Sequence, residues 1–134
     1  MAAGDFIPYG VATMPKYSKL EISDFAHNNA KSVYPNKEQA NKERDAYRHI
    51  LWQAMTANQY GEPTANMLGN MHESQLPFVG TPFQPADQKA MDLYNNRLGV
   101  ELGLRVKTLP EIMMEAKKIV DSGKAKLDSY DGSY

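Results

Sequence analysis

Residues 36–61, NKEQANKERDAYRHILWQAMTANQYG, contain the clearest helix signal in the chain. Asn36 is a residue type that caps helix N-termini, and Gln39 three positions later completes a capping box. Gly61 is a residue type that ends helices, because it accepts a positive φ at little steric cost. The first half of the segment is charged, whereas the second half is apolar on most sides. The segment therefore predicts a long helix whose second half lies at the centre of the core.

Four more segments have helical periodicity and are separated by prolines and glycines. They cover about residues 19–32, 63–74, 86–104 and 110–122. Segment 86–104 combines an apolar stripe with a narrow polar stripe that ends in Gly99 and Gly103, where another backbone can lie close. Residues 76–85 contain three prolines and predict a loop folded over the core. We expect an all-α fold, a single compact domain of four to five helices.

The two ends of the chain differ in composition from its middle. Residues 1–17 combine glycines and prolines with apolar and aromatic side chains, which predicts an irregular, extended N-terminal arm that packs on a protein partner or on its own domain. Residues 18–123 form the predicted helical domain. Residues 124–134 predict a flexible C-terminal tail.

The composition of the 134 residues is that of a soluble globular protein, with 15 basic and 16 acidic side chains and a net charge of −1. This balance gives no electrostatic reason to expect nucleic-acid binding. The absence of cysteine excludes disulfides and thiolate metal sites. We find no apolar run of the ~20 residues that span a membrane and no signal peptide. We therefore expect a cytoplasmic or virion-associated protein, and the sequence leaves open whether it forms oligomers.

Three short clusters place polar side chains on three different predicted helices. They are Arg48 with His49, His72 with Glu73, and Asp92 with Asn95 and Asn96. Helix interiors usually exclude such residues unless the side chains are solvated, paired or functional. If the helices pack side by side, the two histidines and two of the carboxylates converge in one pocket.

Imidazoles and carboxylates together suit a Zn, Mn or Fe ion that keeps an open position for water. In this interpretation His49, His72 and Asp92 bind the metal. The metal lowers the pKa of its bound water, and Glu73 or Asp92 accepts the proton, so that a hydrolase results. Arg48 orients a carboxylate or a substrate anion.

Three further side chains complete the predicted pocket: Trp52 lies beside His49, while Asn95 and Asn96 hydrogen-bond the substrate or the metal ligands. Two alternatives remain open. The catalytic residues Glu73, His72, His49 and Asp92 can instead perform metal-free acid–base chemistry. The same polar cluster can also be a buried hydrogen-bonded network that fixes helix packing, because buried charges must be paired. In that case the protein is a non-catalytic structural or assembly protein that docks through residues 1–17.

The three clusters occur in a wider pattern of motifs. Arg48-His49-x-x-Trp52, His72-Glu73 and Met91-Asp92-x-x-Asn95-Asn96-x-x-Gly99 follow one another over residues 45–103. This order resembles an uncharacterised helical domain found in bacterial and phage proteins. The resemblance implies where a site lies but no activity, because that domain has no established function. By analogy, a small version of the domain suits a minor component of a phage particle.

Overall fold

The computed structural model describes residues 17–75 and 86–127, and for residues 72–75 and 86–88 it describes the backbone alone. The helices are α1 (Lys19–Val33), the short 3-10 helix η1 (Lys37–Gln39), α2 (Glu43–Tyr60), α3 (Glu62–Gln75), α4 (Ala86–Arg105) and α5 (Leu109–Asp121). No strand occurs in the described residues. The expected all-α fold with five helices is confirmed. The predicted arm up to residue 16, the loop 76–85 and the tail beyond residue 127 lie outside the described residues.

The predicted start of the central helix is wrong. Asn36 makes no side-chain cap, and α2 begins at Glu43 rather than directly after Asn36. Arg44 supplies the physical reason, because its guanidinium donates back to the carbonyls of Tyr34 (2.8 Å) and Asn36 (3.3 Å). These bonds hold the connecting segment in a compact turn. A complete capping box occurs instead at the start of α1, between Ser18 and Glu21.

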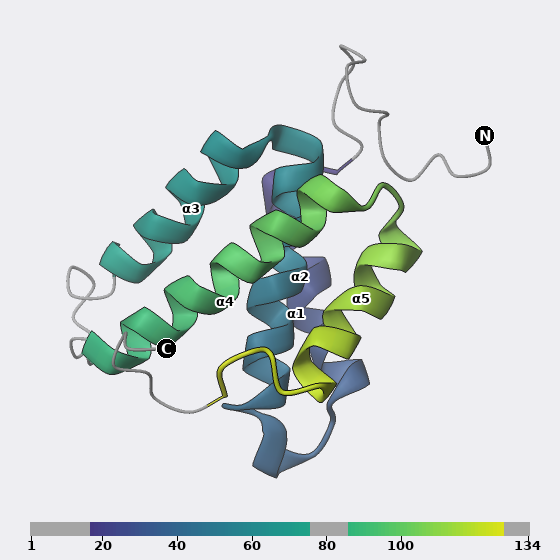
Figure 1. The fold of residues 1–134 in the computed structure, drawn as a ribbon, viewed down its shortest axis with the longest axis vertical. Coiled ribbons are helices and arrows are strands. Elements are labelled where there is room, and N and C mark those ends of the chain that lie inside the picture. Colours follow the sequence, from purple (N-terminus) through teal and green to yellow (C-terminus); the bar gives the residue numbers. More distant parts are fainter. Residues whose placement is uncertain (1–16, 76–85, 128–134) are drawn as a thin grey trace.

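Helix α2 is the centre of the fold and contacts α1, α3, α4 and α5 (Figure 1). Its second half is buried on most sides, as the sequence predicts. The chain reverses at Gly61, whose φ of 94° favours glycine, and α3 runs back along α2. Helix α4 then lies beside α3 with the opposite direction and crosses α2 obliquely, with both helices rising toward the same end of the molecule (Figure 1).

The backbones of α2 and α4 are in close contact. A Cβ atom on Gly103 would lie 2.1 Å from the carbonyl oxygen of Ala54, and one on Gly99 would lie 2.5 Å from that of Ile50. The prediction of a narrow face for another backbone is therefore confirmed. Because both glycines face residues of α2, Asn96 and Asp92, which precede them on α4, lie opposite the earlier turns of α2.

Both ends of the described chain pack on this core. The backbone of Tyr17 donates to Gln59 (2.8 Å) and accepts from the hydroxyl of Tyr60 (2.9 Å). At the other end Ala125 is buried, and Leu127 packs against the core. The packed domain therefore extends to Leu127, beyond the predicted boundary at residue 123.

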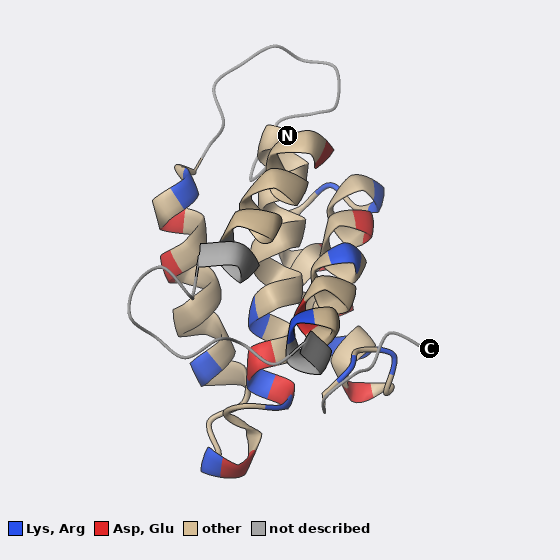
Figure 2. Ribbon diagram, turned by 90° about the vertical axis from the view of Figure 1, so that its left-hand side faces the viewer, with Lys and Arg blue, Asp and Glu red and all other residues tan. Residues whose placement is uncertain are grey.

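Acidic and basic residues are interspersed along the helices (Figure 2). This arrangement agrees with the balanced net charge of the chain. In the part of the chain that the structure describes, no helix combines the length and the apolar character that crossing a bilayer requires.

Replacing Gly103 by alanine tests the contact between α2 and α4. Overpacking against the carbonyl of Ala54 costs about 3 kcal/mol, and the better helix propensity of alanine returns about 1 kcal/mol. The free energy of unfolding, measured by urea denaturation, should therefore fall by about 2 kcal/mol. The control is Glu101→Ala, an exposed position on the same helix, which should change the value by less than about 0.5 kcal/mol. Equal stability of the two variants would contradict the close contact.

Candidate functional site

His49 lies at the centre of the predicted polar cluster. Its side chain projects from α2 toward α4 and is 1% exposed. Two residues of α4 lie around it, Asp92 (6% exposed) and Asn96 (5% exposed). The structure therefore brings together residues from two of the three sequence clusters.

The hydrogen bonds around His49 determine which ring nitrogen carries the proton. Arg48 Nη2 lies 3.2 Å from His49 Nε2, and an arginine can only donate, so Nε2 accepts. The proton of the neutral ring is then on Nδ1, which donates to Asn96 Oδ1 at 2.8 Å. This arrangement leaves the lone pair of Nε2 directed away from Asn96.

Two carboxylates approach this same nitrogen. Asp45 Oδ2 and Asp92 Oδ1 each lie 3.7 Å from His49 Nε2. One ligand atom from each of the three residues lies within 4.8 Å of the others, close enough to share a metal ion. Among the residues that the structure describes, Asp45, His49 and Asp92 are therefore the candidate metal ligands.

Asp45 was not among the predicted site residues. It belongs to the charged first half of the central helix, which the sequence presents as solvated. The signal that could have found it is spacing, since Asp45 and His49 are four residues apart and share one face of the helix. A carboxylate four residues before a buried histidine is well placed to join its site.

Arg48 neutralises part of the acidic charge. Its Nη2 donates to Asp45 Oδ1 at 2.9 Å while it also contacts His49. The side chain is partly exposed, so the guanidinium has a path to solvent. Arg48 thus occupies the position beside Nε2 where a metal ion would compete with it.

The remaining predicted site residues have different positions. The ring of Trp52 lies edge-on to His49, with centroids 6.4 Å apart. Asn95 does not join the cluster, because its amide donates to the carbonyl of Lys126 (2.8 Å) and accepts from the amide of that residue (2.9 Å). His72 and Glu73 lie in the last turn of α3, and their side chains are outside the described part of the structure.

Two cavities flank the cluster. One, of about 230 Å³, lies between α2, α3 and α4 and includes Gln53 and Asn96 in its wall. The other, of about 250 Å³, lies between α1 and the start of α2 and includes Asp45 and Arg48. His49 itself is in neither of these described walls, but each wall includes one of its hydrogen-bonding partners, Asn96 in the first and Arg48 in the second.

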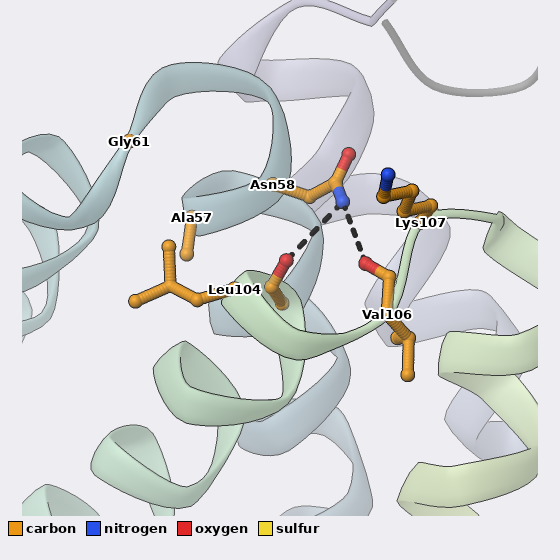
Figure 3. A pocket seen from close by; sticks show the side chains of 7 residues that line it. Ala57, Asn58, Gly61, Leu104, Val106 and Lys107 are labelled. Atoms are coloured by element: carbon orange, nitrogen blue, oxygen red, sulfur yellow. Dashed lines mark hydrogen bonds between the residues drawn. The ribbon is translucent and has the colours of Figure 1, made fainter. Parts of the chain in front are cut away.

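A larger cavity, of about 450 Å³, lies at the far end of α2 (Figure 3). Asn58 projects into it and donates to the carbonyls of Gly103 (3.2 Å) and Val106 (3.0 Å), which ends α4 (Figure 3). Among the described residues of its wall, Lys107 is the one with a charged side chain. These described residues include no carboxylate and no imidazole, so we place the candidate site at His49, where both occur.

Two tyrosines and one carboxyl group outside the cluster have shifted pKa values. Burial raises the pKa of Tyr47 to about 12, and its hydroxyl donates to Asn29 at 2.6 Å. Burial, followed by the hydrogen bond to Asp121, raises the pKa of Tyr34. Hydrogen bonds from Lys117 and then from Tyr34 lower the pKa of Asp121. These groups connect α1, α2 and α5 and have a structural role.

The burial of Tyr47 predicts a specific loss of stability at alkaline pH. Its folded pKa of about 12 exceeds the ordinary value of about 10, so its contribution is full below pH 10 and is lost as the pH rises toward 12. The difference in unfolding free energy between wild type and Tyr47→Phe should therefore shrink over this interval. Denaturant titrations at several pH values measure it, and a constant difference would contradict the assignment.

Comparison with known protein families matches residues 12–128 to a domain of unknown function, DUF6973. No curated protein and no solved structure matches the chain. The matched range includes Asp45, His49, Asp92 and Asn96, and it ends one residue after the packed segment that closes at Leu127. The chain therefore belongs to the DUF6973 family, a domain of unknown function.

Proposed function

We propose that this domain is a hydrolase that uses a divalent metal ion bound by Asp45, His49 and Asp92. The observation that carries the proposal is the approach of three ligand atoms, from two helices, to within 4.8 Å of one another. The proposal keeps His49 and Asp92 as predicted from the sequence and adds Asp45.

The distances between these atoms suit a metal ion. Ligand bonds of about 2.1 Å in a tetrahedral site place neighbouring ligand atoms about 3.4 Å apart. The distances of 3.7 Å from His49 Nε2 to each carboxylate therefore require only a small contraction. One imidazole and two carboxylates are a suitable set for Zn²⁺, Mn²⁺ or Fe²⁺.

Asn96 has the position of an orienting partner. Metal-binding histidines usually donate the proton of the other ring nitrogen to a fixed acceptor, which holds the ring and its tautomer. The bond from His49 Nδ1 to Asn96 Oδ1 provides this contact. The Nε2 lone pair is thereby directed to the carboxylates before any ion arrives.

The direction of α3 supports the proposal that residues of its last turn belong to the metal site. Gly69 faces Gln53 and Asn96, and α3 runs opposite to both neighbouring helices. In the sequence, positions 72 and 73 follow Gly69 by three and four residues, about one helical turn further along α3. We propose that His72 would complete the set of metal ligands and that Glu73 would accept the proton of the attacking water, whose pKa the metal would lower.

Elemental analysis of protein purified without an affinity tag tests the metal site. Wild type should contain about one equivalent of Zn, Mn or Fe. Loss of an orienting partner typically weakens metal binding roughly 10–100-fold, and this is the effect expected for Asn96→Ala. His49→Ala and Asp45→Asn each remove a ligand and should weaken metal binding further. Asp24→Asn, an exposed carboxylate on α1, is the matched control. Binding that survives all three site substitutions would refute the proposal.

Arg48→Met separates a metal site from a structural network. A guanidinium that competes with the ion raises the cost of metal binding, so its removal should strengthen binding at least about tenfold, a change of 1.4 kcal/mol. Isothermal titration with Zn²⁺ and Mn²⁺ measures the change. If Arg48 is instead the permanent counterion of Asp45, the variant should bind no metal and lose stability.

A second candidate function is assembly, and two observations favour it. Arg48 already pairs with Asp45, as a buried network would require. In addition, Tyr17 is fixed to Gln59 and Tyr60, so the predicted arm starts from a defined point on the domain. We therefore keep the alternative of a non-catalytic structural protein, such as a minor phage virion component, whose partner binds the N-terminal arm.

Deletion of residues 1–16 tests the assembly function. If the arm binds a neighbour, the full chain should form an oligomer or a stable complex that the shortened chain cannot form, while the helical fold persists because Tyr17 remains. Light scattering coupled to size exclusion, together with circular dichroism, measures both properties. A monomer in both cases, with no partner retained, would eliminate this alternative.

A further inference from the structure

The cavity between α2, α3 and α4 is lined mainly by carboxamide side chains. Its wall consists of Gln53, Asn66, Gly69, Asn70, Leu93, Asn96 and Arg97. We name it the carboxamide cavity. With about 230 Å³ it has room for several waters or for one small organic group.

Two buried polar atoms in this wall lack a hydrogen-bond partner among residues 17–75 and 86–127. Gln53 is 1% exposed and Asn96 is 5% exposed. Gln53 Oε1 and Asn96 Nδ2 have no hydrogen-bond partner among the described residues. A buried polar atom without a hydrogen-bond partner lowers the stability of the fold by about 1–3 kcal/mol. A ligand or an ordered water that bonds to these atoms would remove this cost. One of the two atoms is an acceptor and the other is a donor.

Gly69 permits this arrangement. A Cβ atom at position 69 would lie 2.3 Å from Gln53 Nε2 and 3.2 Å from Asn96 Nδ2. Any larger residue would have to push the amide of Gln53 into the cavity. The space in front of the two amides therefore depends on a glycine within a helix, where alanine would be preferred on propensity alone.

We propose that the carboxamide cavity binds a neutral carboxamide group of the substrate. The proposal rests on the proposed hydrolase function, because Asn96 belongs to both sites: its Oδ1 accepts from His49, and the residue lines the cavity with its Nδ2 on the side of Gly69. A carboxamide offers an N–H for Gln53 Oε1 and a carbonyl oxygen for Asn96 Nδ2. Leu93 provides an apolar contact for the attached carbon chain.

The charge of the wall explains why a neutral group is preferred. A carboxylate would find no donor at Gln53 Oε1 and would be repelled by that oxygen, whereas a ketone would leave the same oxygen unpaired. Among the described residues of the wall, Arg97 is the one cation, and it is exposed and lies over the ring of Tyr94, 5.7 Å from its centroid. The cavity therefore favours a ligand group that carries both a hydrogen-bond donor and an acceptor, as a carboxamide does.

Saturation-transfer NMR on metal-free protein tests the proposal with three probes of similar size: acetamide, acetate and acetone. Acetamide should bind at least tenfold more tightly than the other two. Gly69→Ala, whose added methyl group would displace the amide of Gln53, and Gln53→Leu, which keeps the volume but removes the acceptor, should each weaken acetamide binding at least tenfold. Circular dichroism confirms that both variants fold, and if Gly69→Ala does not fold, Gln53→Leu decides.

Three results would overturn the proposal: equal binding of the three probes, unchanged acetamide binding in a folded variant, or no binding of any probe, in which case the cavity holds ordered water only.

The variant Asp45→Asn distinguishes this proposal from the proposed metal site. It should abolish metal binding and leave acetamide binding within twofold of wild type, since Asp45 does not line the cavity. Acetamide binding without any metal binding in wild type would refute the hydrolase alone.

Discussion

The contact between the backbones of α2 and α4 determines the rest of the structure. Gly99 and Gly103 bring α4 against the carbonyls of Ile50 and Ala54, closer than any side chain would allow. This contact fixes how α4 is translated and rotated along α2. A shift of one residue would turn Asn96 about 100° away from His49. The polar cluster therefore exists because two glycines, about one and two turns after Asn96, set the distance between the helices.

A polar cluster in such a position has a cost that its partners must offset. His49 is almost completely buried and is held by Asn96 on one side and by Arg48 on the other. Carboxylates at this depth are costly unless a cation neutralises them. In the structure Arg48 provides the positive charge, and in the proposed function a metal ion takes over this role. The structural network and the metal site thus both require a cation beside the carboxylates and His49. They differ in whether that cation is Arg48 or a metal ion.

Helix positions could be predicted well because prolines and glycines separate strongly periodic segments, and Gly61 ends α2 as expected. The start of α2 could not be predicted, because it depends on the hydrogen bonds from the Arg44 side chain to the carbonyls of Tyr34 and Asn36. Capping patterns do not reveal such bonds. His49, Asp92 and Asn96 could be recognised as candidates from their residue types. The sequence could not show that Asn95 and Asn96 have different roles. Only the packing of α4 determines that Asn96 contacts His49 whereas Asn95 contacts Lys126.

The paired hydrogen bonds between Asn95 and Lys126 connect two distant parts of the chain. Asn95 is adjacent to Asn96 on the half of α4 that also carries Asp92, so the segment after α5 acts as a clamp on the helix that builds the cluster. Shortening the chain after Gly123 would remove this clamp along with the buried side chain of Ala125. The geometry around His49 therefore depends on residues 125–127, which are synthesised after all five α-helices, so the helices alone do not complete the support of the cluster.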